Sequence, residues 1–116
     1  MLERIKDKII TVDQALDLVK DDYQIVTGLG ATEGKAFLSN LHKIHGKIKH
    51  CTVNNCLPMG SYEFFTNPEY KSTFQLDGWF YNPGMRKAHA NGNISFIPNH
   101  LHFAGQKRFT HIPVNN

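Results

Sequence analysis

The sequence has few cysteines, no long apolar run and no strong charge of either sign, and each absence excludes a class of protein. Its two cysteines, Cys51 and Cys56, form one C-x4-C spacing, whereas a zinc ribbon needs a second pair. No apolar run approaches the roughly 20 residues of a membrane-spanning helix. Residues 1–20 are charged and amphipathic, unlike a secretory leader. We therefore expect reduced thiols in a cytoplasmic protein that has no membrane partner.

The charge balance excludes a further class. Thirteen basic and 10 acidic residues leave a formal net charge of only +3, and the basic side chains are spread along the chain. A nucleic-acid footprint needs a concentrated basic surface, so we expect no nucleic-acid partner. What the sequence does contain is 41% apolar residues and 11% aromatic residues, most of the latter between Tyr62 and Phe109. This is the composition of one ordinary globular domain at most.

The first half of the chain alternates helix and strand. A helix is expected behind Thr11, which forms a capping-box pattern with Gln14. A short strand over residues 23–28 then leads into a glycine-rich turn and a second helix, which Gly46 ends. Another strand is expected over residues 47–53. This order predicts a βαβ unit with parallel strands and a right-handed crossover.

The second half repeats the alternation with shorter elements. A short helix is expected near Pro68, followed by a strand that bends at Gly78. Asn82 is placed to cap the next helix, with Pro83 at its first position and Gly92 at its end. The remaining expected elements are a strand over 93–98, a helix over 100–109 that is capped by Asn99, and a strand beginning near 111–114. The predicted fold class is α/β, with an open, mostly parallel sheet and flanking helices.

The last expected strand, residues 111–114, begins just as the sequence stops. A complete domain rarely ends in this way, so we expect the domain to be incomplete and the chain to be a fragment of a longer protein. A sheet that ends in an unpaired strand exposes backbone hydrogen-bonding groups, which favour pairing with another chain. A homo-oligomer is therefore expected.

The glycine turn is the first candidate site. Gly28, Gly30 and Glu33 give G-x-G-x-x-E, whereas the dinucleotide fingerprint requires a third glycine and an acidic residue about 20 positions later. The pattern therefore disfavours a nicotinamide site. Two interpretations stay open, namely a loop whose backbone amides face some other ligand and a plain turn between strand and helix.

A hydrolase based on a thiol or a metal is the second candidate. A nucleophilic Cys56 would need a nearby base, such as His50, or a helix N-terminus to lower its pKa. His100 and His102 are candidate metal ligands, but a catalytic zinc takes about three protein ligands. Residues two apart in a helix also point to different sides. We therefore expect no metal, and we expect His100 to line a pocket while His102 is structural.

Several segments together resemble the N-terminal half of the acetyl-CoA hydrolase/transferase family, which includes the acetate, butyrate, succinyl and 4-hydroxybutyrate CoA-transferases. The resemblance is carried by "VTGLGATEGKAFLSNL", by "LDGWFYNPGMRKAHANGNISFIPNHLHFAGQKRF" and by "HIPVN", in that order. Within the family, the segment "NPEYKSTFQLDGWF" is most similar to the 4-hydroxybutyrate and butyrate types. The resemblance covers essentially all 116 residues.

The resemblance implies two related α/β domains that face each other across an active site. Coenzyme A passes from an acyl-CoA to a free carboxylate, and a glutamate of the second domain carries it as a thioester. No metal or redox cofactor is implied, because the coenzyme A thioester is the substrate. None of the four glutamates of this chain, Glu3, Glu33, Glu63 and Glu69, matches the catalytic position. Residues 1–116 are thus expected to be the N-terminal part of a CoA-transferase domain that is inactive alone.

The resemblance also implies which residues contact the substrates. The loops at 28–32, 54–60 and 80–83 would face the acyl group or carboxylate. Asn99 and His100 would lie near the interface between the two domains. The residues expected to bind substrate are Gly28, Gly30, Asn55, Gly60, Tyr81, Asn82, Asn99 and His100. The expected partners are an acyl-CoA, a small carboxylate and the missing C-terminal domain or a second chain. The alternative is a non-catalytic remnant, or one chain of a split enzyme, that acts as a binding module.

Overall fold

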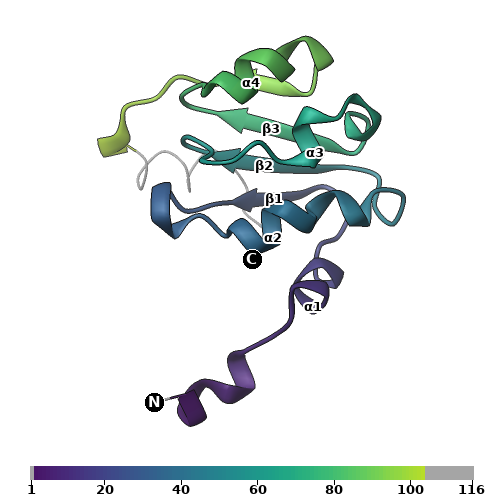
Figure 1. Cartoon of the computed structure of the whole chain (residues 1–116), viewed down its shortest axis with the longest axis vertical. Helices are drawn as coiled ribbons and strands as arrows, with labels where there is room; N and C mark the ends of the chain where they lie inside the picture. Colours follow the sequence, from purple (N-terminus) through teal and green to yellow (C-terminus); the bar gives the residue numbers. More distant parts are fainter. Residues whose placement is uncertain (1, 104–116) are drawn as a thin grey trace.

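A parallel sheet, four-stranded within the described residues, forms the centre of the molecule. The structure is a computed structural model that describes residues 2–103 (Figure 1). Every neighbouring pair of strands is parallel, and the spatial order is β1-β2-β3-β4. The strands are β1 (Tyr23–Val26), β2 (Cys51–Asn55), β3 (Phe74–Gly78) and β4 (Ile94–Phe96). This arrangement confirms the predicted α/β fold class and the predicted parallel pairing of the first two strands.

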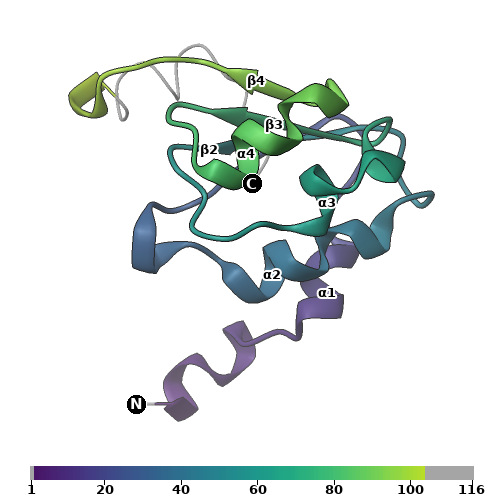
Figure 2. The same ribbon diagram turned by 45° about the horizontal axis from the view of Figure 1, so that its top comes forward.

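The helices cover one face of this sheet. The α-helices of the described residues are α1 (Val12–Asp17), α2 (Lys35–Asn40), α3 (Glu63–Thr66) and α4 (Pro83–Ala88). Short 3-10 helices accompany them: η1 (Leu2–Lys8), η2 (Gly30–Thr32), η3 (Leu41–Ile44), η4 (Pro68–Tyr70), η5 (His89–Asn91) and η6 (Leu101–Phe103). When each crossover is right-handed, strands added in chain order carry their connecting helices on the same face. Figure 2 shows α2, α3 and α4 together on one side of the sheet.

The hydrophobic core lies between this face and the helices. One cluster of buried side chains combines residues of all the α-helices named above with alternate residues of the strands. Phe64 and Phe65 of α3 are 1% and 0% exposed, and the ring of Phe64 meets that of Phe74 edge-on at 6.0 Å. Leu38 of α2 and Leu76 of β3 are equally buried. The core therefore fixes the helices over the strands and holds the loops at the strand ends in place.

The opposite face of the sheet is polar, although parallel sheets usually carry apolar side chains on both faces. Asn54 Nδ2 donates to Gln24 Oε1 at 2.9 Å. Gln75 Nε2 donates to Ser95 Oγ at 2.8 Å and to Asp77 Oδ1 at 3.2 Å. Burial raises the pKa of Asp77, against the opposing effect of the hydrogen bond from Gln75. Two of these hydrogen bonds join neighbouring strands, and the bond between Gln75 and Asp77 lies within β3.

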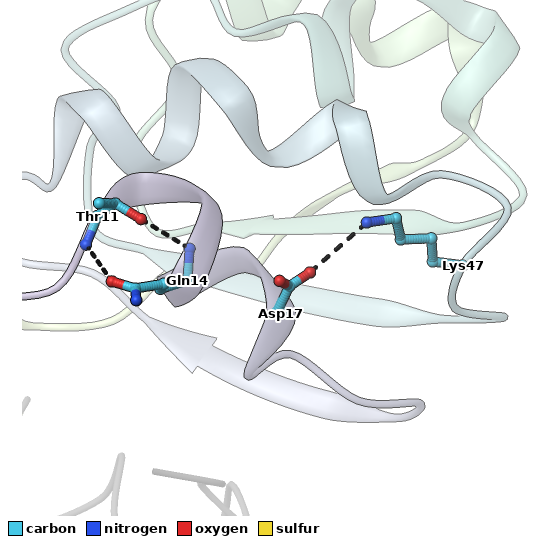
Figure 3. Close-up of polar contacts among 4 residues, drawn as sticks. All are labelled: Thr11, Gln14, Asp17 and Lys47. Atoms are coloured by element: carbon cyan, nitrogen blue, oxygen red, sulfur yellow. Dashed lines mark hydrogen bonds and ion pairs between the residues drawn. The ribbon is translucent and has the colours of Figure 1, made fainter.

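Local sequence signals account for the helix ends. Thr11 Oγ1 accepts from the Gln14 N–H at 3.1 Å, and Gln14 Oε1 accepts from the Thr11 N–H at 2.9 Å, which completes the predicted capping box (Figure 3). Figure 3 also shows an exposed ion pair in which Lys47 Nζ lies 3.5 Å from Asp17 Oδ1. An exposed pair of this kind adds little stability. Gly92, with φ of 83°, ends η5 in the left-handed conformation, as predicted from its sequence position.

Two expected elements have different limits in the structure. β2 runs from Cys51 to Asn55 rather than over 47–53, because its ladder with β3 extends to the pair formed by Asn55 and Gly78. The last two residues of β2 were expected in a loop. α3 was not predicted, since four residues are too few to show a helical period.

The segment after β4 also differs from expectation. Instead of a helix that begins at residue 100, the described residues form a 3-10 helix over Leu101–Phe103. Asn99 Oδ1 accepts from the N–H of the adjacent His100 at 2.9 Å. The rest of the expected helix and the expected strand near 111–114 lie outside the described residues.

Candidate functional site

The loops that follow the strands gather at one edge of the sheet. Because all four strands are parallel, their carboxyl ends coincide, and open α/β sheets bind ligands at that edge. Apolar side chains are exposed there. Within residues 2–103, six large apolar side chains after β1 are more than two-fifths exposed. They are Leu29, Met59, Phe80, Phe96, Ile97 and Leu101. All of them lie in or beside these loops, so the carboxyl edge presents an apolar rim.

Glu33 joins the first two loops of this edge. Its Oε1 accepts from Asn55 Nδ2 at 2.9 Å, and its Oε2 accepts from the Tyr62 hydroxyl at 2.6 Å and from the Met59 N–H at 3.2 Å. Burial, then the hydrogen bond to Glu33 and the negative charge of that residue, raise the pKa of Tyr62 well above its ordinary value. The carboxylate therefore ties the loop after β1 to the loop after β2.

A small cavity opens beside Glu33. Its volume is about 200 Å³, and its lining residues are Gly30, Ala31, Glu33, Lys35, Met59, Gly60 and Tyr62. The structure thus brings together two of the predicted substrate-binding glycines from different loops. Gly30 has φ of 60°, which favours glycine, and a Cβ on Gly60 would lie 2.8 Å from the Tyr62 ring.

Two further predicted residues, Gly28 and Asn55, do not line the cavity but lie in or beside its loops. A Cβ on Gly28 would lie 2.5 Å from the carbonyl oxygen of Thr32, so only glycine fits that tight turn. Asn55 is 1% exposed, and its Nδ2 is occupied by Glu33. Its Oδ1 is buried and accepts no hydrogen bond from the described residues. Both residues therefore position the loops that border the cavity.

A larger groove lies farther along the same edge. It has a volume of about 720 Å³ and is lined by Phe80, Tyr81, Arg86, His89 and Phe96. The Tyr81 hydroxyl and His89 Nδ1 are hydrogen-bonded at 2.9 Å, and the rings of Tyr81 and Phe96 meet edge-on at 5.2 Å. Burial and the negative charge of Asp77 raise the pKa of Tyr81. Among the described residues, Arg86 forms no ion pair.

Asn82 stands between the groove and the loop after β2. Its Oδ1 accepts from the Met85 N–H at 2.7 Å, which caps α4, and its Nδ2 donates to the Pro58 carbonyl oxygen at 2.6 Å. One side chain thus orients the helix that carries Arg86 and also fixes the neighbouring loop.

We expect Asn82→Ala to lower the free energy of unfolding by about 2 kcal/mol, which is at the upper end of the usual cost of removing a helix cap. The cost is high because the substitution also removes the hydrogen bond to the Pro58 carbonyl oxygen. Thr11→Ala is the matched control, since it removes an exposed cap without a tie to another loop. Urea denaturation followed by circular dichroism measures both changes. A loss for Asn82→Ala no greater than that for Thr11→Ala would contradict the double role.

The two histidines near residue 100 lie closer together than expected. The ring centroids of His100 and His102 are 5.6 Å apart, whereas residues at this spacing in a helix were expected to point to different sides. His100 precedes the 3-10 helix, so helical spacing does not apply to the pair. Asn99 is half-buried and His100 is exposed, both after the end of β4. Within residues 2–103, no group of three or more His, Cys, Asp or Glu side chains is placed to hold a metal ion.

The cysteines lie inside the fold. Cys51 is 0% exposed and Cys56 is 5% exposed, and neither forms a disulfide bond within the described residues. Burial raises the pKa of Cys51 to about 12. His50 precedes β2 whereas Cys56 follows it, so the whole strand separates the suggested base from that thiol. No described helix has the length and apolar character that crossing a lipid bilayer requires.

Sequence reasoning missed three functional features of this edge. Glu33 was considered only as a mismatch to the dinucleotide fingerprint and to the catalytic glutamate. Arg86 was considered only as part of the family-like segment after the third strand, and Tyr62 was not singled out. An acidic residue just before a helix start was the one local signal for Glu33. The partners of Glu33 in these contacts lie 22 to 29 residues away in sequence, and no local pattern indicates them.

Comparisons with known proteins support the fold. No family model matches the sequence, and a search among curated proteins finds no match. RipA from Yersinia pestis superposes with a TM-score of 0.78 at 16% identity, over 98% of this chain and 29% of that one. Two RipA variants give TM-scores of 0.82 and 0.81 at 17% and 16% identity, over 99% and 98% of this chain and 29% and 28% of theirs. The likeness shows the fold alone, and the chain spans less than a third of the length of these structures.

Proposed function

We propose that the chain is the N-terminal, acid-binding part of a CoA-transferase. The complete enzyme would move coenzyme A between an acyl-CoA and a short-chain carboxylate such as acetate, butyrate or 4-hydroxybutyrate. The observation that carries the proposal is the pair of glycine-bearing loops that Glu33 joins beside a cavity, at the edge where open α/β sheets bind ligands. The order of family-like segments along the sequence supports the same assignment.

The charges at this edge suit carboxylate ligands. Lys35 borders the small cavity, and Arg86 borders the large groove. Each is a cationic group beside an otherwise neutral or apolar wall, apart from Glu33, whose carboxylate is occupied by three donors. Charge-assisted hydrogen bonds to lysine or arginine are among the stronger polar contacts that a carboxylate can form.

The covalent step belongs to a second domain in this proposal. A glutamate there would attack the acyl thioester and then carry coenzyme A as its own thioester, while backbone N–H groups stabilise the oxyanion. This chain would hold and orient the acid. Leu29, Met59 and Phe80 are exposed at the same edge, and exposed apolar patches mark protein interaction sites. They support a second domain or chain docked over the site.

The setting of the reaction is part of the proposal. Two buried cysteines that form no disulfide bond within the described residues fit a reducing compartment, and we place the enzyme in the cytoplasm. We also propose a homo-oligomer, because β1 and β4 are the edge strands of the described sheet and edge strands favour pairing.

An isotope-exchange assay tests the proposed function. The chain alone is expected to exchange no label between butyryl-CoA and labelled acetate. Mixed with the separately produced second domain of a butyrate CoA-transferase, it is expected to support exchange. The second domain alone is the control and is expected to exchange no label. Exchange by the chain alone would contradict the proposal. So would the absence of exchange in a mixture that forms a complex on size-exclusion chromatography.

A further inference from the structure

The large groove differs in character from the small cavity. Its volume is about 720 Å³ against about 200 Å³, and of the five described residues that line it, four carry rings. Phe80 and Phe96 are 45% and 55% exposed, although each could bury far more of its ring in a core. Pockets of a few hundred to about 1,000 Å³ with aromatic walls and a few polar groups typically bind small organic molecules.

The walls of this groove are held in place by contacts of their own. Tyr81 meets Phe96 edge-on at 5.2 Å and is hydrogen-bonded to His89 at 2.9 Å. These three residues belong to the loop after β3, to β4 and to η5. The ring positions are therefore fixed before any ligand arrives, which lowers the ordering cost of binding.

Arg86 gives the groove its permanent charge. It lies in α4, the helix that Asn82 caps, and its side chain is exposed. No described carboxylate pairs with it. A guanidinium presents a planar fork of N–H donors that matches a carboxylate with two parallel hydrogen bonds. The groove thus offers one anion-binding group beside a set of aromatic surfaces.

We infer that the groove binds an organic acid with an aromatic or similarly bulky apolar body, with its carboxylate paired to Arg86 and its body between Phe80 and Phe96. A four-carbon acid would leave most of these rings in water, whereas an aryl group covers them and gains both area burial and ring contacts. The biological meaning of this inference rests on the proposed function, to which it adds aryl-bearing acids as a substrate class. The binding itself needs no transfer step.

Three probes separate the contributions of charge and ring. The probes are 3-phenylpropanoate, 3-phenylpropan-1-ol, which keeps the ring without the charge, and butyrate, which keeps the charge without the ring. We expect the full chain to bind 3-phenylpropanoate at least about ten-fold more tightly than either other probe, as measured by isothermal titration calorimetry or ligand-observed NMR. Equal affinity for the acid and the alcohol, or no binding of the acid in the millimolar range, would overturn the inference.

A matched pair of variants places the binding in the groove. Arg86→Gln is expected to weaken binding of 3-phenylpropanoate about ten-fold and to leave binding of the alcohol unchanged. Lys87→Gln removes the same charge from the next residue, which lines a different cavity, and is expected to bind like the parent chain. Circular dichroism checks that both variants fold. Equal losses in the two variants would refute a specific role for Arg86.

The outcomes also separate this inference from the proposed function. Exchange between butyryl-CoA and acetate in the two-part mixture, without binding of 3-phenylpropanoate, would refute the aryl-acid inference alone. Binding that depends on Arg86, without exchange in a mixture that forms a complex, would refute the transferase assignment and keep the groove as an acid-binding site.

Discussion

Replacing Phe65 with alanine is expected to lower the free energy of unfolding by about 3–5 kcal/mol, the usual cost of removing a buried phenylalanine ring. Phe65 is 0% exposed, and its ring centroid lies 5.3 Å from that of Phe64 and 6.3 Å from that of Tyr62. A natural domain is stable by only about 5–15 kcal/mol, so this one change removes a large share of the total. Chemical denaturation followed by circular dichroism measures it.

Phe80→Ala is the control for this prediction. It removes the same ring from a side chain that is 45% exposed, and its effect on stability is expected to be several-fold smaller than that of Phe65→Ala. Equal costs for the two variants would contradict the assignment of Phe65 to the core and Phe80 to the rim.

Phe65→Ala should also affect the large groove. Asn91 Nδ2 donates to the carbonyl oxygens of Phe65 and Thr66 at 3.4 and 3.1 Å, which ties α3 to η5, the element that carries His89. Loosening α3 is therefore expected to weaken the ordered ring wall as well as the fold.

Replacing Glu33 with alanine is expected to cost about 2–3 kcal/mol of folding free energy, because it leaves buried donors without their acceptor. Asn55 is 1% exposed and Tyr62 is 5% exposed, and both donate to this carboxylate. The loop after β1 and the loop after β2 lose their shared anchor. Ligand binding in the small cavity should therefore weaken together with stability.

Two amide variants distinguish the role of geometry from that of charge. Glu33→Gln keeps the size of the side chain but turns one acceptor oxygen into a donor that faces other donors, so we expect a substantial loss. Glu63→Gln removes the same charge from an exposed side chain and is expected to change stability by no more than about 0.5 kcal/mol. Thermal and urea denaturation of both variants provide the measurement, and equal effects would contradict the anchoring role of Glu33.

Features with short-range signals could be predicted from the sequence. Thr11 and Asn82 cap the helices that their positions indicate, and Pro83 occupies the first position of α4. Gly92 ends the segment after α4 in the left-handed conformation that only glycine adopts at little cost. In each case the interaction joins residues no more than four apart, so the local pattern contains both partners. The alternation of these elements was sufficient to predict the α/β class.

Features that depend on distant pairing could not be predicted in this way. The end of β2 is set by the pairing of Asn55 with Gly78, which lies on another strand. The contacts of Glu33 with Asn55 and Tyr62 form only once the strands lie side by side. The groove likewise combines residues from a loop, a helix and a strand end. Tertiary geometry, rather than local propensity, determines these parts of the site.

Mapping of butyrate on the backbone amide spectrum of the isotope-labelled chain is the decisive measurement. We expect the chemical shift changes to concentrate in the loops at residues 27–34, 56–62, 79–82 and 97–100, which follow the four strands. The amino ends of the strands and the outer surface of α1 and α2 should stay unchanged. Changes confined to those surfaces, with the four loops unaffected, would contradict the assignment of the carboxyl edge as the acid-binding site.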